Sequence, residues 1–123
     1  HKNFVIVDAA MNDLIRPTVY YGYHHIDPVV EADFYAPRIT ADIVGPVCET
    51  GDYLALDRDM PLPEPGDLLS VATAGAYGAV QAGTYNTRLL VPEVLVNGDR
   101  FHVIRPRRTY EELIGLDSVP DWL

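Results

Sequence analysis

Ten prolines and nine glycines divide this chain of 123 residues into short segments. Proline removes a backbone hydrogen-bond donor and glycine favours turns, so such frequent interruptions favour many short strands over long helices. The length suits one compact domain, residues 1–123, that can bury a core. Hydrophobic residues make up 48% of the chain and charged residues 22%, which is typical of a globular protein rather than a disordered one.

Runs rich in β-branched and aromatic residues predict strands at residues 4–7, 18–26, 39–47 and 68–73. The first run, Phe4–Val7, is apolar throughout, which suits a strand buried on both faces. Residues 9–15 predict one helical turn that Pro17 stops. Residues 57–67 hold three prolines among several acidic residues, and this composition predicts an exposed loop.

The clearest local signals lie in the last third of the chain. Asn97-Gly98 stands between two strand-like arms in residues 93–104, which predicts a hairpin with a type I′ turn. Thr109 and Glu112 have the spacing of a helix capping box, and Gly115 stands where that helix should end. Together, the predicted strands, hairpin and short helices indicate a mainly β, mostly antiparallel domain that is closed or nearly closed into a Greek-key-like β-barrel.

Charge and hydropathy argue against several classes of partner. The formal net charge of −9 disfavours both nucleic acid and an anionic membrane, since each would require a basic face. No apolar run approaches the roughly 20 residues of a membrane-spanning helix, and there is no secretory signal. Cys48 is the single cysteine, which excludes an internal disulfide and fits a cytoplasmic location. The abrupt apolar start at Phe4 suggests a piece of a longer polypeptide.

Four segments resemble the diaminopimelate decarboxylase family in order and spacing. They lie in residues 7–20 (with MNDLIRP at 11–17), 45–52 (GPVCETGD), 74–78 (AGAYG) and 85–88 (YNTR). Residues 65–67 (PGD) and 107–113 (RRTYEEL) are also similar to that family, so the resemblance covers nearly the whole chain. MNDLIRP together with CETGD is the most specific part, whereas GAYG is shared with the ornithine decarboxylases.

The resemblance implies that this chain is the C-terminal domain of a two-domain enzyme with the alanine racemase/ornithine decarboxylase-like fold. Such an enzyme uses pyridoxal 5′-phosphate, held as a Schiff base on a lysine of an N-terminal (β/α)8 barrel, and a homodimer builds each active site from both subunits. It converts meso-2,6-diaminopimelate to L-lysine and CO2. The only lysine here is Lys2, and no glycine-rich phosphate loop precedes a helix, so the chain alone is expected to be inactive.

The same resemblance implies roles for five residues. Arg16 and Tyr20 bind the distal carboxylate of the substrate, and a planar guanidinium suits that task. Glu49 pairs with the distal ammonium group. Cys48, reaching in from the partner subunit, donates a proton after CO2 has left. Tyr77 hydrogen-bonds the cofactor phosphate and lies near the substrate. No role is assigned to Asn86 or Arg88.

Each of these residues also has an interpretation without a functional role. Without the surrounding motifs, Arg16 would be a surface arginine, Tyr20 and Tyr77 would be packing tyrosines, and Cys48 would be a small buried hydrophobe. His24 and His25 are adjacent on a predicted strand and point to opposite faces, so no metal site is predicted. Two functional alternatives remain open: a related decarboxylase acting on ornithine or arginine, and a non-catalytic binding or regulatory homologue.

Overall fold

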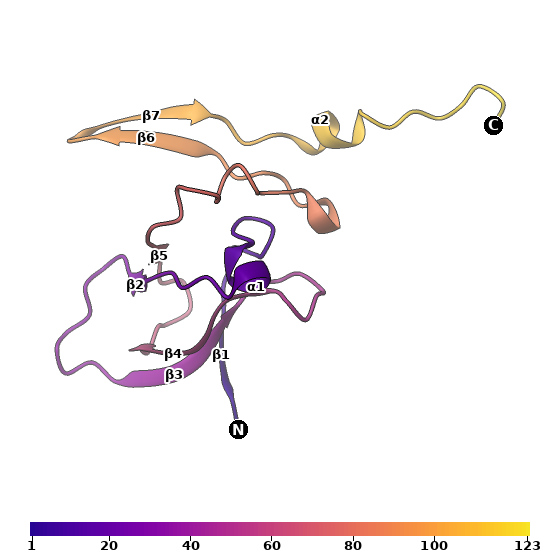
Figure 1. Ribbon diagram of the computed structural model, residues 1–123. Coiled ribbons are helices and arrows are strands. Elements are labelled where there is room, and N and C mark those ends of the chain that lie inside the picture. Colours follow the sequence, from indigo (N-terminus) through magenta and orange to yellow (C-terminus); the bar gives the residue numbers. More distant parts are fainter. The chain divides into compact units, whose positions relative to one another are not determined.

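The computed structural model describes residues 1–123, which divide into two compact units, residues 1–82 and 83–123 (Figure 1). Seven strands and three short helical segments make up the regular structure, which confirms a mainly β chain with short helices. Three of the four strand pairings are antiparallel. The strands form three separate sheets, of three, two and two strands. That residues 1–123 form a single domain stays a prediction.

The first unit holds two of these sheets and one helix. Its elements are β1 (Asn3–Ile6), α1 (Arg16–Tyr20), β2 (Ile26–Pro28), β3 (Arg38–Val44), β4 (Tyr53–Pro61) and β5 (Leu69–Val71). The larger sheet has the order β1-β3-β4, with β1 parallel to β3 and β4 antiparallel to it. Strands β2 and β5 pair antiparallel as a second sheet. The buried core lies between these elements and consists of Leu14, Ile26, Ile43, Leu54, Ala55 and Met60.

A buried carboxylate supports an irregularity between β3 and β4. The pairing shifts register between Ala41 and Ile43, and Asp57 on the facing strand has a positive φ of 46°. Asp42 lies at this point, where its carboxylate accepts hydrogen bonds from Lys2 Nζ (2.8 Å) and from the backbone N–H of Asp57 (2.8 Å). The carboxylate therefore pairs a backbone donor that the register shift takes out of the ladder.

The first predicted strand exists but is not buried on both faces. Phe4 is 58% exposed and Ile6 is 75% exposed, because they point to one face of β1 while Val5 and Val7 point to the other face and pack against the core. The strand predicted for residues 39–47 is present as β3, and the strand predicted for residues 68–73 is present as β5. Both are shorter than predicted.

Pro17 starts a helix instead of stopping one, so the strand predicted for residues 18–26 is wrong before residue 26. Proline suits the first turn of a helix, since its φ is already helical and its missing N–H has no partner there. Tyr21, at a φ of 55°, ends α1. The helical turn predicted for residues 9–15 is present only as a turn at residues 11–13, where the backbone N–H groups of Asp13 (2.9 Å) and Leu14 (3.3 Å) donate to the carbonyl of Ala10. The Asp13 carboxylate in turn accepts from the backbone N–H of Ala10 (2.9 Å).

The loop predicted for residues 57–67 is wrong in its first part, because β4 continues to Pro61. The negative charges there do not prevent pairing, since Asp59 forms an ion pair across the sheet with Arg38 (2.7 Å). Pro61 is the last residue of the strand, where a missing backbone donor costs little. Residues 62–67 are outside regular structure, as predicted.

The second unit holds a 3-10 segment (Tyr85–Thr87), β6 (Glu93–Asn97), β7 (Arg100–Arg105) and α2 (Tyr110–Ile114). The predicted hairpin is confirmed, but Asn97 pairs with Arg100, so the two connecting residues are Gly98 and Asp99. Of these two only Gly98 has a positive φ (62°), whereas a type I′ turn needs positive φ at both. The type I′ prediction is therefore wrong.

The predicted capping box is confirmed. The Thr109 hydroxyl accepts from the backbone N–H of Glu112 (3.2 Å), and the Glu112 carboxylate accepts from the backbone N–H of Thr109 (2.9 Å). The helix ends at Gly115 as predicted, although the φ of Gly115 is −67° and not the left-handed value common at this position.

Candidate functional site

Asp52 joins the two segments that carry four of the five predicted site residues. It is 5% exposed, and its carboxylate accepts from the backbone N–H of Met11 (2.7 Å) and of Val47 (2.6 Å). Met11 belongs to the turn that leads into α1, and Val47 begins the turn that carries Cys48 and Glu49. One buried charge therefore holds both segments through charge-assisted hydrogen bonds, which are stronger than neutral ones.

Helix α1 lies directly against the turn of residues 48–52 (Figure 1). The Thr18 hydroxyl donates to the backbone carbonyl of Gly51 at 2.5 Å. A Cβ at Gly51 would lie 2.7 Å from Thr18 Cγ2, so a larger residue at position 51 would force Thr18 to shift. The helix that bears Arg16 and Tyr20 is thus fixed to the turn that bears Cys48 and Glu49.

Gly45 allows the Asp52 carboxylate to reach its place. Its backbone N–H donates to the backbone carbonyl of Asp52 (3.1 Å). A Cβ at Gly45 would lie 2.5 and 2.6 Å from the two carboxylate oxygens of Asp52 and 2.7 Å from the carbonyl oxygen of Ala9. Gly45 and Asp52 therefore act as a pair, at the two ends of the segment GPVCETGD.

Sequence reasoning missed Asp52, although it belongs to the CETGD motif. The available signal was an acidic residue placed directly before the apolar run of residues 53–56 and seven residues after a glycine. That signal does not specify burial. Only the contact with Met11, which is 41 residues away, shows what the carboxylate holds.

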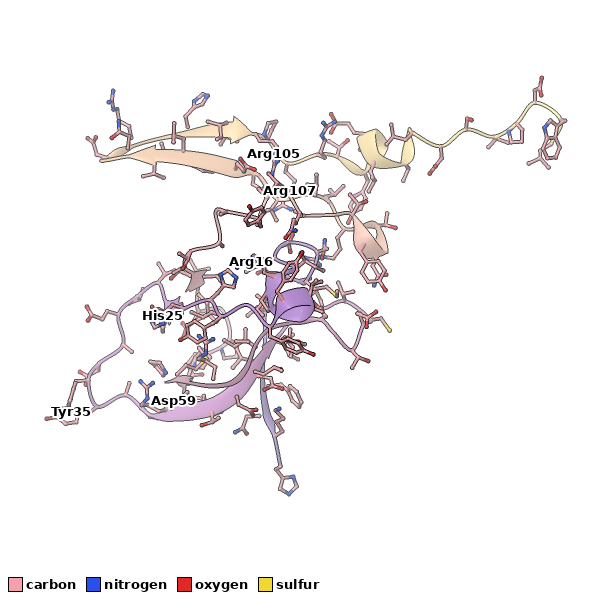
Figure 2. All side chains as sticks on the ribbon, in the orientation of Figure 1. Arg16, His25, Tyr35, Asp59, Arg105 and Arg107 are labelled. Atoms are coloured by element: carbon pink, nitrogen blue, oxygen red, sulfur yellow. The ribbon has the colours of Figure 1, made fainter.

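Three of these four predicted site residues have exposed side chains, and the fourth is half-buried. Arg16 opens α1 and is half-buried (Figure 2), whereas Tyr20 closes the helix and is 59% exposed. Cys48 is an exposed free thiol, and Glu49 is exposed beside it, with one carboxylate oxygen accepting from the backbone N–H of Gly51 (3.3 Å). A packing role for Tyr20 and a buried role for Cys48 are thereby excluded in this chain.

Tyr77 lies on a different segment, which follows β5. Residues 75–78 form a turn in which the backbone N–H of Gly78 donates to the carbonyl of Gly75 (3.4 Å). Tyr77 adopts a positive φ of 60° there, which costs an ordinary side chain on the order of 1 kcal/mol. Gly78 is indispensable to the turn, because a Cβ would lie 1.9 Å from the carbonyl oxygen of Ala74. The phenol is 62% exposed.

Lys2, the only lysine in the sequence, is occupied by an ion pair. Its amine lies 2.8 Å from Asp42 and 3.3 Å from Asp57. The hydrogen bond to Asp42, opposed by partial burial and assisted by Asp57, raises the pKa of Lys2 above its ordinary value of 10.5. Because two carboxylates engage this amine, Lys2 does not fit covalent attachment of pyridoxal phosphate.

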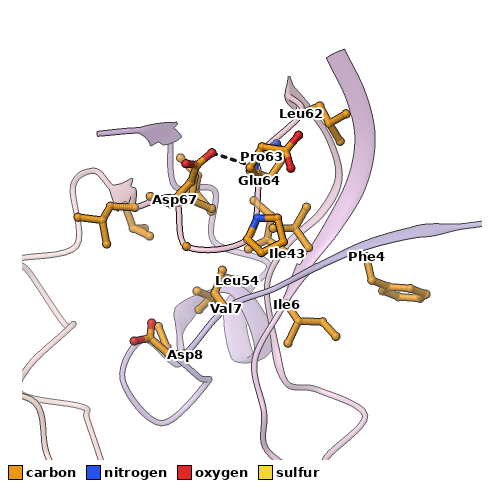
Figure 3. Close-up of a pocket in the computed structure, with 18 of the residues that line it drawn as sticks. Phe4, Ile6, Val7, Asp8, Ile43, Leu54, Leu62, Pro63, Glu64 and Asp67 are labelled. Carbon is orange, nitrogen blue, oxygen red and sulfur yellow. Dashed lines mark hydrogen bonds between the residues drawn. The ribbon is translucent and has the colours of Figure 1, made fainter. Parts of the chain in front are cut away.

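An apolar pocket of about 640 Å³ lies elsewhere in the first unit (Figure 3). Residues of β1 and of the loop at 62–68 line it, with Val7, Ile43 and Leu54 among the apolar side chains. At its rim the Asp67 carboxylate accepts from the backbone N–H of Glu64 (2.8 Å). None of the five predicted site residues lines this pocket.

No helix in the chain exceeds five residues, and none could span a membrane.

Comparison with known proteins gives a consistent result. A family profile described as the C-terminal sheet domain of pyridoxal-dependent decarboxylases matches residues 1–75. The chain is 54% identical over 119 residues to a diaminopimelate decarboxylase of Pseudomonas aeruginosa, covering 97% of this chain and 28% of that protein. It is 48% identical over 123 residues to one of Archaeoglobus fulgidus, covering 100% of this chain and 29% of that protein.

A solved structure agrees with the sequence relatives. The diaminopimelate decarboxylase of M. jannaschii in complex with L-lysine superposes with a TM-score of 0.89 and 38% identity, covering 98% of this chain and 27% of that chain. This chain therefore spans less than a third of the length of the relatives that it matches.

Proposed function

Since the chain belongs to the family of pyridoxal-dependent decarboxylases, as their C-terminal sheet domain, we propose that it is part of a diaminopimelate decarboxylase. The full enzyme removes CO2 from the D-configured centre of meso-2,6-diaminopimelate and releases L-lysine. The observation that carries the proposal is the attachment of α1, with Arg16, to the turn that carries Glu49, through Asp52. That attachment places a cation and an anion on adjoining segments.

Arg16 and Glu49 together recognise the distal end of the substrate. That end carries both a carboxylate and an ammonium group, so a guanidinium and a carboxylate leave neither charge unpaired. Tyr20 adds a hydroxyl from the other end of the same short helix. Ornithine and lysine end in an amine alone, and with them Arg16 would face no carboxylate. The opposite charges on α1 and on the neighbouring turn therefore favour diaminopimelate over other basic amino acids.

Cys48 supplies a proton from Sγ to the carbon that has lost CO2. Its exposed thiol has no partner within this chain that would occupy it, which fits a group acting on a site outside the chain. In a homodimer this thiol reaches the active site of the partner subunit. Bound pyridoxal phosphate supplies the electron sink for the loss of CO2.

The remaining parts of the active site come from outside these residues. An N-terminal (β/α)8 barrel supplies the lysine that holds the cofactor and most contacts to its phosphate, since Lys2 is paired with Asp42. Tyr77 contributes its exposed hydroxyl to that phosphate. This chain alone is inactive. A lone unpaired thiol at Cys48 fits a reducing cytoplasm.

The decisive experiment measures CO2 release by the full-length enzyme containing this chain. Glu49→Gln removes the charge opposite the distal ammonium group at nearly constant shape. We expect kcat/KM for meso-diaminopimelate to fall by about 100-fold or more, the effect of truncating one side of a desolvated charge pair. Glu31→Gln, at an exposed loop position, is the matched control and should leave kcat/KM unchanged.

Two results would overturn the proposal. Equal kcat/KM values for the Glu49 and Glu31 variants would remove Glu49 from the substrate site. A native enzyme that releases CO2 from ornithine or arginine faster than from meso-diaminopimelate would refute the substrate. A Cys48→Ser variant with native kcat would refute the proton-donor role alone.

A further inference from the structure

His24 is a buried polar side chain that the proposed reaction does not use. It is 1% exposed, and with Ile43 and Met60 it is among the largest fully buried side chains. Its Nδ1 lies 3.2 Å from the backbone carbonyl oxygen of Ala72. Since a carbonyl oxygen only accepts, Nδ1 carries the proton of this hydrogen bond. The other ring nitrogen, Nε2, is buried without a hydrogen-bond partner.

The backbone around His24 is itself held firmly. Arg58 donates from Nη1 to the carbonyl oxygen of His24 (2.8 Å), and its guanidinium stacks 4.2 Å from the centroid of the Tyr23 ring. The carbonyl oxygen of His25 accepts from the backbone N–H of Ala72 (2.8 Å). Both backbone polar groups of Ala72 are therefore bound by residues 24 and 25, one through a side chain and one through the backbone.

Ala72 begins the segment that ends in the Tyr77 turn. Two residues of this segment, Thr73 (φ 56°) and Tyr77 (φ 60°), adopt the left-handed conformation that side chains disfavour. Such conformations persist only where surrounding contacts fix them. At its far end the segment turns at Gly78, where no side chain would fit against the carbonyl of Ala74, and Ala74 itself packs against the core. At the near end the segment is fixed by two contacts of Ala72, with the His24 side chain and with the backbone carbonyl of His25.

We propose that His24 is a positioning residue that fixes the segment 72–78 and thereby aims the Tyr77 hydroxyl at the cofactor phosphate. This inference rests on the proposed function of Tyr77. His24 is 1% exposed, so we assign it no contact to substrate or cofactor. It acts through the hydrogen bond from Nδ1 to Ala72, so only a side chain with a donor at that position can replace it.

Two amides test the position of the donor in the full-length enzyme. His24→Asn places an amide N–H where Nδ1 stands, whereas His24→Gln places it near Nε2, where no acceptor exists. The matched control is His25→Asn at the adjacent, exposed histidine, whose ring is paired with Asp27 (2.9 Å) (Figure 2). Cofactor affinity is measured by equilibrium absorbance titration, and amide hydrogen exchange of residues 72–78 is measured in the cofactor-free enzyme.

We expect the His24→Gln variant to bind pyridoxal phosphate about tenfold more weakly and to exchange the amides of residues 72–78 about tenfold faster, the effect of one lost hydrogen bond. The His24→Asn and His25→Asn variants should stay within about twofold of the native enzyme in both measurements. Native values for His24→Gln, or equal losses for His24→Asn and His24→Gln, would overturn the inference.

A double-mutant cycle with Tyr77→Phe separates positioning from general destabilisation. If His24 acts through the Tyr77 hydroxyl, His24→Gln should weaken cofactor binding by less than about twofold once that hydroxyl is absent. Full additivity would show that His24 acts by another route and would refute the inference. A Tyr77→Phe variant with native cofactor affinity would instead refute the role of Tyr77 in the proposed function, and the inference would fail with it.

Discussion

Replacing Asp52 with asparagine is expected to separate α1 from the turn of residues 48–52. The carboxylate accepts two backbone hydrogen bonds, from Met11 (2.7 Å) and from Val47 (2.6 Å), at a site that is 5% exposed. Asparagine keeps one acceptor oxygen and turns its NH2 group toward the other backbone donor. One charge-assisted hydrogen bond is thereby lost, and one buried N–H is left without a partner.

The magnitude follows from these two losses. A hydrogen bond to a charged group contributes about 1.5–3 kcal/mol, and an unsatisfied buried donor costs about 1–3 kcal/mol. Their sum gives about 2.5–6 kcal/mol of local destabilisation, a large share of the 5–15 kcal/mol that stabilises an ordinary domain. Because Arg16 and Glu49 lie on the two segments, we also expect kcat/KM for meso-diaminopimelate to fall.

Native-state hydrogen exchange of the Met11 and Val47 amides in the full-length enzyme measures the local free energy directly. Asp59→Asn is the matched control, because Asp59 is exposed and its ion pair with Arg38 should contribute less than about 1 kcal/mol. If Asp52→Asn left exchange at both amides unchanged, or changed it no more than Asp59→Asn does, the buried carboxylate would not be what holds the two segments.

Three further predictions concern stability. Gly45→Ala should destabilise the protein by about 1–3 kcal/mol in chemical denaturation, because the new methyl group overlaps the Asp52 carboxylate; a native transition would contradict the close approach. Thr109→Ala removes the capping box and should destabilise α2 by about 1 kcal/mol. The amides of residues 110–114 should then exchange faster with solvent, and an unchanged exchange rate would show that the cap contributes nothing. Burial raises the pKa of Asp42, but hydrogen bonds from Lys2 and a backbone N–H lower it to a net value below 3.8, so its stabilisation is present at neutral pH and is lost as the pH falls through the lowered value. Lys2→Met should therefore move the acid-unfolding midpoint, followed by circular dichroism, to higher pH, and an unmoved midpoint would show that the pair does not contribute.

Prediction from sequence succeeded where the determining contacts are local. The capping box needs only Thr109 and Glu112, three residues apart, and the structure shows both of its hydrogen bonds. The hairpin of residues 93–105 likewise forms between neighbouring arms, although its turn is displaced by one residue from Asn97-Gly98. The motifs predicted the family, and the family profile confirms it. The roles of Arg16 and the other predicted site residues stay predictions.

Prediction failed where distant residues decide the local conformation. The aromatic run at residues 18–26 resembles a strand, yet its first part is helical, because Pro17 favours a first helical turn and Thr18 is bonded to Gly51. Strand β4 continues through the acidic residues 57–59 to Pro61 because β3 pairs with it as far as Arg38. Strand β1 is apolar enough to be buried on both faces, but only its Val5 and Val7 face packs against the core.

The sequence by itself determined the capping box of Thr109 and Glu112, the hairpin of residues 93–105, and the family to which the chain belongs. The tertiary structure decided which of them meet. Asp52 and Met11 are 41 residues apart, and His24 and Ala72 are 48 residues apart, so no local pattern specifies either hydrogen bond. Both bonds exist because burial makes an unpaired polar group costly, and the fold places one partner within reach.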